Sequence, residues 1–282
     1  MNAPATTAPR IEFRDVDGLR IRFADSGAPH ERTLVLTSPW PESVFAFSRI
    51  WSELAQHARL FAVDLPGFGA SDSREDLFSP RAMGRFLAQL IGEAELGRPY
   101  VLGPDVGTAA TLFAAAEHPE LLAGAIVGTG GAAVPLQLGE PLASWVLDPD
   151  LEKYRKMDPR MIVNAAIEKI AGGVDDAVRE DYLDCYDGQR FADSMLYVRR
   201  YPVELPELAK LLPAIRTPVT IINGRNDPVV PLANAEYLDE RLPNSRLAVI
   251  DAGHMVWEER PREYASIVLD AITSAPAEAG DS

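Results

Sequence analysis

The chain has 282 residues, of which 47% are hydrophobic and 24% charged, a composition typical of a globular protein with one large core. A single domain with an insertion is therefore favoured over two independent domains. The 42 acidic and 27 basic side chains give a formal charge of -15, which repels phosphate groups and disfavours nucleic acid and anionic membranes as partners.

The single cysteine and the N-terminal segment bear on the cellular compartment in which we expect the protein. Cys185 is alone, which excludes an internal disulfide and a cysteine-rich metal site and favours a reducing compartment, the cytoplasm. Residues 1–10 lack the apolar segment of a signal peptide, and no apolar run approaches the length of a membrane span. We expect residues 1–10 and 274–282 to be disordered.

Residues 11–15 and 19–24 alternate apolar with polar side chains around Asp17-Gly18, which predicts an antiparallel hairpin at a sheet edge. Continuous apolar runs typical of buried parallel strands follow at residues 34–36, 60–63, 100–102, 125–127, 219–222 and 247–250. Crossover helices are expected at residues 43–57, 80–96, 106–118 and 233–242. These elements predict an α/β fold, with a mostly parallel eight-stranded sheet flanked by helices.

One long segment interrupts this alternation of strands and helices. Residues 131–216 carry helix-like, Pro-interrupted sequence without a clear buried strand. We interpret them as a helical lid inserted into a core formed by residues 11–130 and 217–273. Such a lid would cover the carboxyl ends of the parallel strands, where open α/β sheets bind their ligands.

The run at residues 100–102 leads into Gly103-Pro104-Asp105-Val106-Gly107, and a helix of small residues follows at once. This pattern matches a nucleophile elbow, G-x-Nuc-x-G, with Asp where Ser is usual. The glycines have a steric reason, because side chains at the flanking positions would collide with the neighbouring strand and helix. Alternatively, Asp105 could simply cap the helix after a Gly-rich turn.

Two later residues favour the catalytic interpretation. Asp227 lies in the loop after the run at residues 219–222, and His254 follows the run at residues 247–250. A lone histidine or a lone loop aspartate is more often structural, but here nucleophile, acid and base each follow a successive core strand in the order expected for this fold. We predict a triad of Asp105, Asp227 and His254, with Asp251 the lesser candidate for the acid.

With these motifs the chain resembles the α/β-hydrolase superfamily over nearly its whole length. Residues 64–72, Asp-Leu-Pro-Gly-Phe-Gly-Ala-Ser-Asp, look like the family's D-x-P-G-x-G-x-S-D loop. Ser38-Pro39-Trp40-Pro41 occupies the place of the H-G-x-P oxyanion segment, with Ser-Pro replacing His-Gly. The resemblance implies an oxyanion hole formed by the amides of Trp40 and Val106. With Asp in the elbow, the chain resembles two subfamilies in particular, the epoxide hydrolases and the haloalkane or haloacid dehalogenases.

A carboxylate nucleophile selects the kind of carbon that is attacked. An ordinary Asp, with a pKa near ~4, is ionised at neutral pH and needs no base to activate it. Displacement at a saturated carbon gives an alkyl ester of Asp105, which water activated by His254 and Asp227 can cleave. A serine attacking the same carbon would give an ether, which water does not readily cleave.

The leaving group separates epoxides from halides. A leaving alkoxide needs a proton, which a tyrosine can supply, whereas a halide needs only weak N–H donors. In the dehalogenases that the chain resembles, the residue directly after the nucleophile is typically Trp (haloalkane dehalogenases) or Arg (fluoroacetate-type dehalogenases). This chain has Val106 at that position. The resemblance to epoxide hydrolases implies one phenol from early in the lid and one from its last helix, which fits Tyr154 and Tyr197, with Tyr201 the replacement. Lid tyrosines also commonly serve in packing.

We therefore expect a cofactor-free epoxide hydrolase that acts with water on a small or medium apolar epoxide. No spacing of His, Asp or Glu suggests a metal site. Besides Tyr201, Trp145 and Met195 are weaker candidates for the substrate pocket. The alternatives are a carbon–halogen hydrolase with the same triad, and a non-hydrolytic member that binds a ligand or performs a biosynthetic rearrangement. The sequence gives no indication of the oligomeric state.

Overall fold

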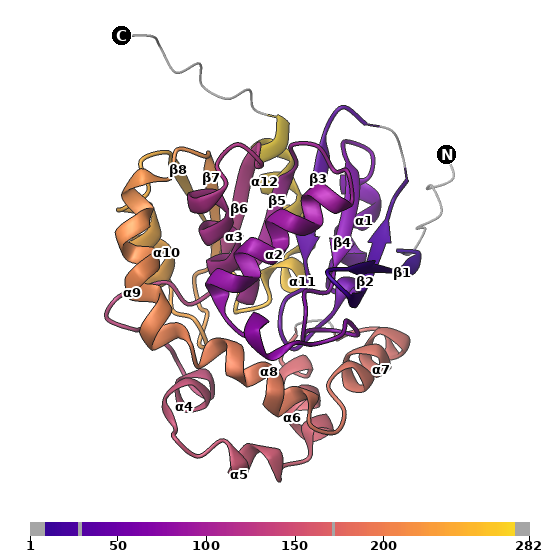
Figure 1. Cartoon of the computed structure of the whole chain (residues 1–282), viewed down its shortest axis with the longest axis vertical. Coiled ribbons are helices and arrows are strands. Elements are labelled where there is room, and N and C mark those ends of the chain that lie inside the picture. The colour runs from indigo at the N-terminus through magenta and orange to yellow at the C-terminus, as the bar shows by residue number, and fades with distance from the viewer. Residues whose placement is uncertain (1–8, 28–29, 171–172, 274–282) are drawn as a thin grey trace.

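The computed structural model describes residues 9–27, 30–170 and 173–273, and it is built around an eight-stranded sheet with strand order β1-β2-β4-β3-β5-β6-β7-β8 (Figure 1). β1 pairs antiparallel with β2, and β2 antiparallel with β4, whereas the strands from β3 to β8 run parallel to one another. The strands are β1 Ile11–Val16, β2 Leu19–Asp25, β3 Thr33–Thr37, β4 Arg59–Val63, β5 Tyr100–Pro104, β6 Gly124–Gly128, β7 Val219–Gly224 and β8 Ser245–Ile250.

Helices cover both faces of the sheet, which is why its central strands are apolar throughout. α2 and α3 pack together on one face, and α1 and α12 contact each other on the opposite face (Figure 1). α10 contacts β7 and β8. The bounds of the core helices are α1 Ser48–Leu54, α2 Pro80–Glu93, α3 Val106–Glu117, α9 Tyr201–Leu211, α10 Ala233–Asp239, α11 Val256–Glu259 and α12 Pro261–Thr273. Short 3-10 helices lie at Val44–Phe47, Glu75–Leu77 and Leu212–Ala214.

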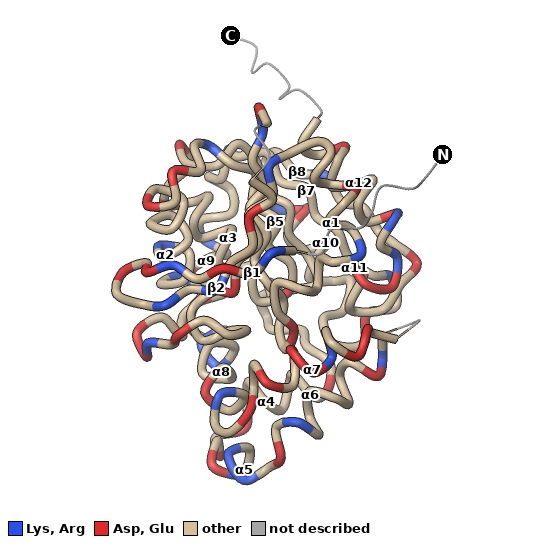
Figure 2. Tube along the Cα trace, turned by 90° about the vertical axis from the view of Figure 1, so that its right-hand side faces the viewer, with Lys and Arg blue, Asp and Glu red and all other residues tan. Residues whose placement is uncertain are grey.

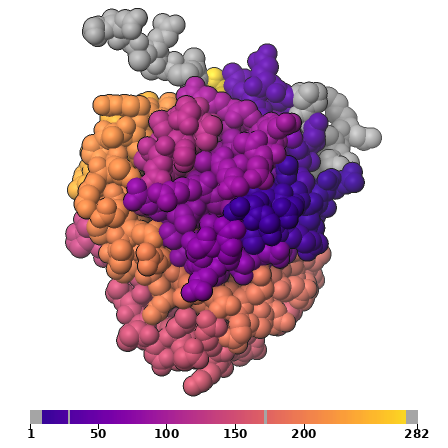
Figure 3. All heavy atoms as spheres, viewed as in Figure 1, coloured from indigo at the N-terminus to yellow at the C-terminus, as the bar shows by residue number. Residues whose placement is uncertain are grey.

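Between β6 and β7 the chain leaves the core and forms a group of short helices below the carboxyl ends of the strands (Figure 1). These are α4 Leu142–Leu147, α5 Glu152–Arg155, α6 Pro159–Ile167, α7 Asp176–Cys185 and α8 Arg190–Val198. The space-filling view shows this group packed closely against the core on the face in view (Figure 3). We call α4 to α8 the lid.

The predicted α/β fold is confirmed, including the eight strands and their mostly parallel order. The first turn is a tight hairpin, because Asp17 and Gly18 both have positive φ, 54° and 73°. The predicted lid, residues 131–216, contains one helix of the core: α9 contacts α2 and α3. The segments predicted to be disordered lie outside the described residues, apart from Pro9 and Arg10. No helix of the described residues is long and apolar enough to cross a membrane.

Candidate active site

Asp105 lies at the sharp turn between β5 and α3, with φ 52° and ψ -121°. An L-residue adopts such a conformation only when its surroundings impose it. A Cβ on Gly103 would come within 2.1 Å of Thr111 Oγ1, and one on Gly107 within 2.2 Å of Thr37 Oγ1. Glycine is therefore required on both sides of Asp105, as the elbow pattern predicts.

The two oxygens of the Asp105 carboxylate have different surroundings. Oδ2 accepts a hydrogen bond of 2.7 Å from the backbone N–H of Trp40, and the backbone N–H of Val106 also bonds to the carboxylate. Oδ1 lies 3.7 Å from Nε2 of His254. Oδ2 thus lies at the Trp40 N–H, one of the two donors predicted to form the oxyanion hole, and Oδ1 faces the histidine.

His254 is held by the aspartate that the sequence pairs with it. Its Nδ1 lies 2.8 Å from Oδ2 of Asp227, whose side chain is fully buried. The other oxygen of Asp227 accepts hydrogen bonds from the backbone N–H groups of Val229 and Val230. Asp251 is exposed and accepts a bond from the Asn226 amide instead. The structure therefore brings Asp105, His254 and Asp227 together in the predicted order.

Burial and mutual attraction set the charges of this site. Burial raises the pKa of Asp105 above its ordinary value, although the positive charge of His254 and the two backbone N–H bonds oppose the rise. Burial alone would lower the pKa of His254, but the carboxylates of Asp227 and Asp105 outweigh it and raise that pKa. The ion pair between Asp105 and His254 therefore stabilises the charged forms of both residues.

A cavity of about 660 Å³ opens at Asp105 and His254. Its walls are predominantly apolar and come from both the core and the lid, including Leu142, Trp145, Met157, Met161, Ile162 and Met255. This size and lining are typical of a site for an apolar small molecule. Trp145, expected at the pocket from the sequence, lines the cavity. No cluster of three potential metal ligands occurs in the described part of the chain.

The structure does not bring the predicted tyrosine pair together at this cavity. The hydroxyl of Tyr197 donates a 2.7 Å hydrogen bond to the carbonyl of Val106, and that of Tyr154 lies 3.5 Å from a carboxylate oxygen of Asp148. Neither residue lines the cavity, and the same is true of Met195 and Tyr201. The sequence places these side chains in the lid but cannot indicate their direction, because short helices can rotate to bury either face.

Glu42 is a residue that the sequence interpretation missed. It lies two positions after Trp40, where its buried carboxylate accepts a 2.8 Å bond from the indole N–H of Trp257, and its backbone carbonyl accepts a bond from the Tyr186 hydroxyl. Burial, followed by the charge of Glu258, raises the pKa of Glu42 well above its usual value. Glu42 thus ties the Trp40 segment to α11, two residues beyond His254. The only sequence signal for this role is a Glu directly after the Trp40-Pro41 pair.

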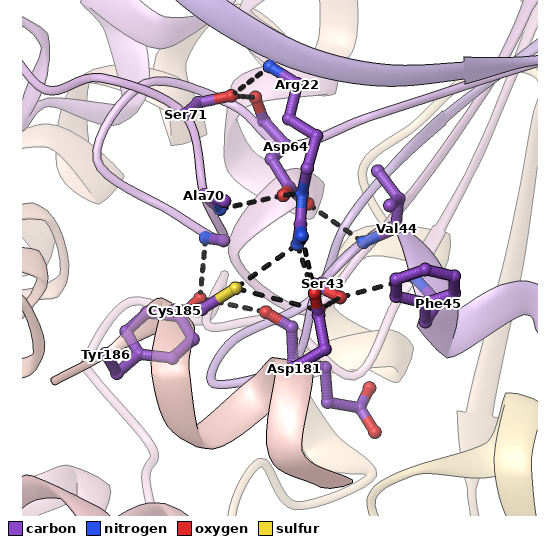
Figure 4. Close-up of polar contacts among 12 residues, drawn as sticks. Arg22, Ser43, Val44, Phe45, Asp64, Ala70, Ser71, Asp181, Cys185 and Tyr186 are labelled. Carbon is purple, nitrogen blue, oxygen red and sulfur yellow. Dashed lines mark hydrogen bonds and ion pairs between the residues drawn. The ribbon is translucent and has the colours of Figure 1, made fainter. Parts of the chain in front are cut away.

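A second buried polar group joins the lid to the core (Figure 4). Arg22 of β2 donates to Asp64 over 2.5 Å and to Asp181 of α7 over 2.6 Å, and its guanidinium contacts the Cys185 sulfur at 3.2 Å. Ser43 donates to the same Asp181. We call Arg22, Asp64 and Asp181 the lid anchor, because they fix α7 beside the segment that carries Trp40.

The eight-stranded sheet, the strained elbow and the assembled triad together define a hydrolase of the α/β fold. A family model described as "alpha/beta hydrolase fold" matches residues 33–261. The chain belongs to this family.

Similar proteins include hydrolases of several substrates. The chain is 25% identical to the 2-hydroxy-6-oxononadienedioate/2-hydroxy-6-oxononatrienedioate hydrolase of Burkholderia vietnamiensis, over 89% of this chain and 90% of that protein. The structure of Cfl2 from Burkholderia cenocepacia covers 95% of this chain and 97% of its own, with a TM-score of 0.80 and 24% identity. Epoxide hydrolase A of Mycobacterium thermoresistibile matches with a TM-score of 0.77 and 16% identity, covering 94% of this chain and 98% of its own. At these identities the two structures show a shared fold.

Proposed function

We propose that the protein opens epoxides to diols through a covalent alkyl ester on Asp105. The observation that carries this proposal is the orientation of the Asp105 carboxylate. Oδ2 is bound at the backbone N–H of Trp40, while Oδ1 lies beside His254 at the cavity. A carboxylate so held presents one oxygen as a nucleophile and keeps the other where the oxyanion will form.

The first step forms an ester. Oδ1 attacks an epoxide carbon from the cavity, the carbon–oxygen bond of the ring breaks, and the released alkoxide takes a proton from an acid. In the second step His254 removes a proton from water, and the hydroxide attacks Cγ of Asp105 while the charge on Oδ2 rests on the N–H groups of Trp40 and Val106. The bond from Cγ to Oδ1 then breaks, His254 returns the proton, and the diol leaves carrying Oδ1.

Esterification also prepares His254 for its task. The negative charge of Asp105 contributes to the raised pKa of His254. Once Asp105 is an ester that charge is gone, so the pKa of His254 falls and the neutral imidazole, which can accept a proton, becomes more populated. The base is thereby activated at the step that needs it.

Tyr201 is our candidate for the acid that protonates the alkoxide. Its hydroxyl has no hydrogen bond to any described residue, whereas those of Tyr154 and Tyr197 have carboxylate or carbonyl oxygens nearby. Burial, and then the charge of Asp105, raise the pKa of Tyr201 well above its usual value, so it carries its proton at neutral pH. A small rotation of the first turn of α9 would bring this hydroxyl to the cavity.

Tyr201→Phe is expected to lower kcat/KM for epoxides by about 10²- to 10⁴-fold, the usual contribution of a general acid. Steady-state kinetics on a terminal epoxide measure this loss. Tyr197→Phe is the matched control, because it removes a neighbouring phenol whose hydrogen bond is already made to Val106. If Tyr197→Phe abolished turnover and Tyr201→Phe did not, the acid would be the residue expected from the sequence.

A second candidate function is hydrolysis of carbon–halogen bonds with the same nucleophile. It is favoured by two indole side chains, Trp40 and Trp145, which line the cavity with ring centroids 5.2 Å apart. The indole N–H of Trp40 has no acceptor among the described residues. A leaving halide requires only weak N–H donors of this type.

His254→Gln separates these functions and tests the covalent step. The variant should form the alkyl ester but not hydrolyse it, so the ester should accumulate to about one per protein. Intact-protein mass spectrometry after exposure to epoxides and alkyl halides measures the adduct. A gain equal to the whole epoxide supports epoxide opening, and a gain of the alkyl group without halide supports the second candidate.

The double variant Asp105→Ala, His254→Gln is the control for this trapping experiment. It should gain no mass, since the acceptor oxygen is gone while the cavity is otherwise preserved. Adducts at another residue, or no adduct with either class of reagent, would contradict the proposed mechanism.

A further inference from the structure

One face of α6 forms a wall of the cavity. Met161, Ile162, Ala165 and Ala166 line it, and Lys169, four residues beyond Ala165, continues the same face. The backbone N–H of Lys169 bonds to the carbonyl of Ala166, so the helical turn extends past the end of α6. The wall thus passes from a long apolar side chain, over two small ones, to a cation.

The mouth of the cavity is apolar as well. Met157 and Met161 line the cavity and are 49% and 71% exposed, two of the large hydrophobic side chains that the described surface leaves open to water. Exposed methionines next to a pocket are typical of surfaces that adapt to flexible apolar ligands. They indicate a substrate with a long apolar part rather than a compact one.

The Lys169 ammonium is a free charge in this setting. Its side chain makes no ion pair or hydrogen bond within residues 9–27, 30–170 and 173–273. In the lid, Lys153, by contrast, pairs with Asp148, and Arg160 with Glu180. The one carboxylate of the cavity wall besides Asp105, that of Glu259, accepts a bond from the backbone N–H of Gly253 on the core side.

We propose that Lys169 binds the carboxylate of an amphipathic substrate, an aliphatic acid that carries the reactive epoxide along its chain. The apolar chain would lie against Met157, Met161 and the two alanines, with the reactive carbon at Asp105. This proposal rests on the proposed function and deepens it by naming the substrate class. Acidic and basic residues are interspersed over core and lid (Figure 2), and charges more than about 8 Å apart are screened, so the local cation outweighs the negative net charge.

Lys169 also lies just past the carboxyl end of α6, which ends at Ile167, where a cation can stabilise the helix dipole. A purely structural role of this kind predicts that Lys169→Ala lowers the melting temperature and leaves ligand selectivity unchanged. The substrate-binding role predicts the reverse, so the two are distinguished by measuring both quantities.

The test measures binding without relying on turnover. Dodecanoate and methyl dodecanoate differ in charge but not in chain, and their binding can be followed by quenching of tryptophan fluorescence, since Trp40 and Trp145 line the cavity. We expect the wild-type protein to bind dodecanoate about 5- to 10-fold more tightly than the ester at about 0.15 M salt, and this preference to shrink as more salt is added. Lys169→Ala should abolish the preference and Lys169→Arg should keep it.

Lys156→Ala is the matched control, because it removes an exposed lid lysine that borders Met157 but does not line the cavity. It should leave the preference for dodecanoate unchanged. Equal binding of acid and ester by the wild-type protein, no binding of either, or unchanged selectivity in Lys169→Ala would each overturn the role of Lys169.

Turnover of an epoxydodecanoic acid and its methyl ester then separates this inference from the proposed function. Preference for dodecanoate without any epoxide turnover would refute the function and leave the carboxylate site in place. Epoxide turnover with equal kcat/KM for acid and ester would refute the site and leave the function in place.

Discussion

Asp105→Ala is expected to reduce epoxide turnover by about 10⁴-fold or more, because it removes the carboxylate oxygen beside His254 that is proposed to form the ester intermediate. The fold should survive, since the substitution removes a carboxylate whose burial raises its pKa and is therefore costly to keep charged. Steady-state kinetics measure the first effect, and thermal melting should show an unchanged or higher Tm.

Asp105→Ser provides a sharper control. A serine at this position would attack a saturated carbon to give an ether that the site cannot cleave, so epoxide turnover should be lost as fully as in Asp105→Ala. The same serine, next to His254 and the Trp40 amide, has the parts needed to cleave an activated ester. Wild-type levels of epoxide turnover in either variant would refute Asp105 as the nucleophile.

Of the substitutions proposed for this protein, Arg22→Met is expected to lower the stability most, by about 3–5 kcal/mol in the free energy of unfolding. The substitution leaves Asp64 fully buried without its cation and releases Asp181 of the lid. Urea unfolding followed by circular dichroism measures the change, which corresponds to a drop in Tm on the order of 10 °C. Arg74→Met is the matched control: its pairs with Asp17 and Asp76 are on the surface, where such pairs contribute about 0–1 kcal/mol.

The pH dependence of this loss has a definite sign. Burial raises the pKa of Asp64, and the Arg22 charge opposes that rise. Without Arg22 the folded-state pKa moves further above the unfolded value of about 4, so the penalty is full at neutral pH and shrinks as the pH falls through the folded-state pKa. The stability gap between wild type and Arg22→Met should therefore narrow toward pH 5, and Asp64→Asn in the Arg22→Met background should narrow it at pH 7. A loss no larger than that of Arg74→Met would show that the lid anchor contributes little.

The fold was largely predictable because its core strands have strong local signals. Six continuous apolar runs and one Asp-Gly hairpin specify the sheet, and the parallel arrangement follows from the helices between the runs. Helix ends were less predictable: the helix expected at residues 43–57 is a 3-10 turn followed by α1. Ser43 caps this 3-10 turn, because its hydroxyl accepts a hydrogen bond from the Phe45 N–H.

The triad was predictable for a geometric reason. Asp105, Asp227 and His254 each follow a parallel strand, and the carboxyl ends of neighbouring parallel strands meet at one edge of a sheet. The lid tyrosines have no such constraint. Whether Tyr197 points toward the cavity or toward the Val106 carbonyl depends on the rotation of α8, which is set by packing against Phe68 and other distant residues.

The buried charged residues could not be recognised from the sequence. Arg22 is polar in an alternating strand and would normally face water, but α7, brought from far along the chain, covers it with Asp181. Glu42 is buried for the same reason, by contact with Trp257. Contacts between residues so far apart in sequence leave no local pattern.

The proposed catalytic residues belong to the core, whereas α6 forms part of the cavity wall. This separation bears on how the substrate range of the protein can change. The residues proposed to make and break bonds follow the ends of core strands, whereas α6 contributes a wall of the cavity and none of the triad. Single replacements along Met161, Ala165 and Lys169 can therefore alter which molecules are accepted without retuning the reaction itself. This wall is therefore a natural target for laboratory evolution of the substrate range.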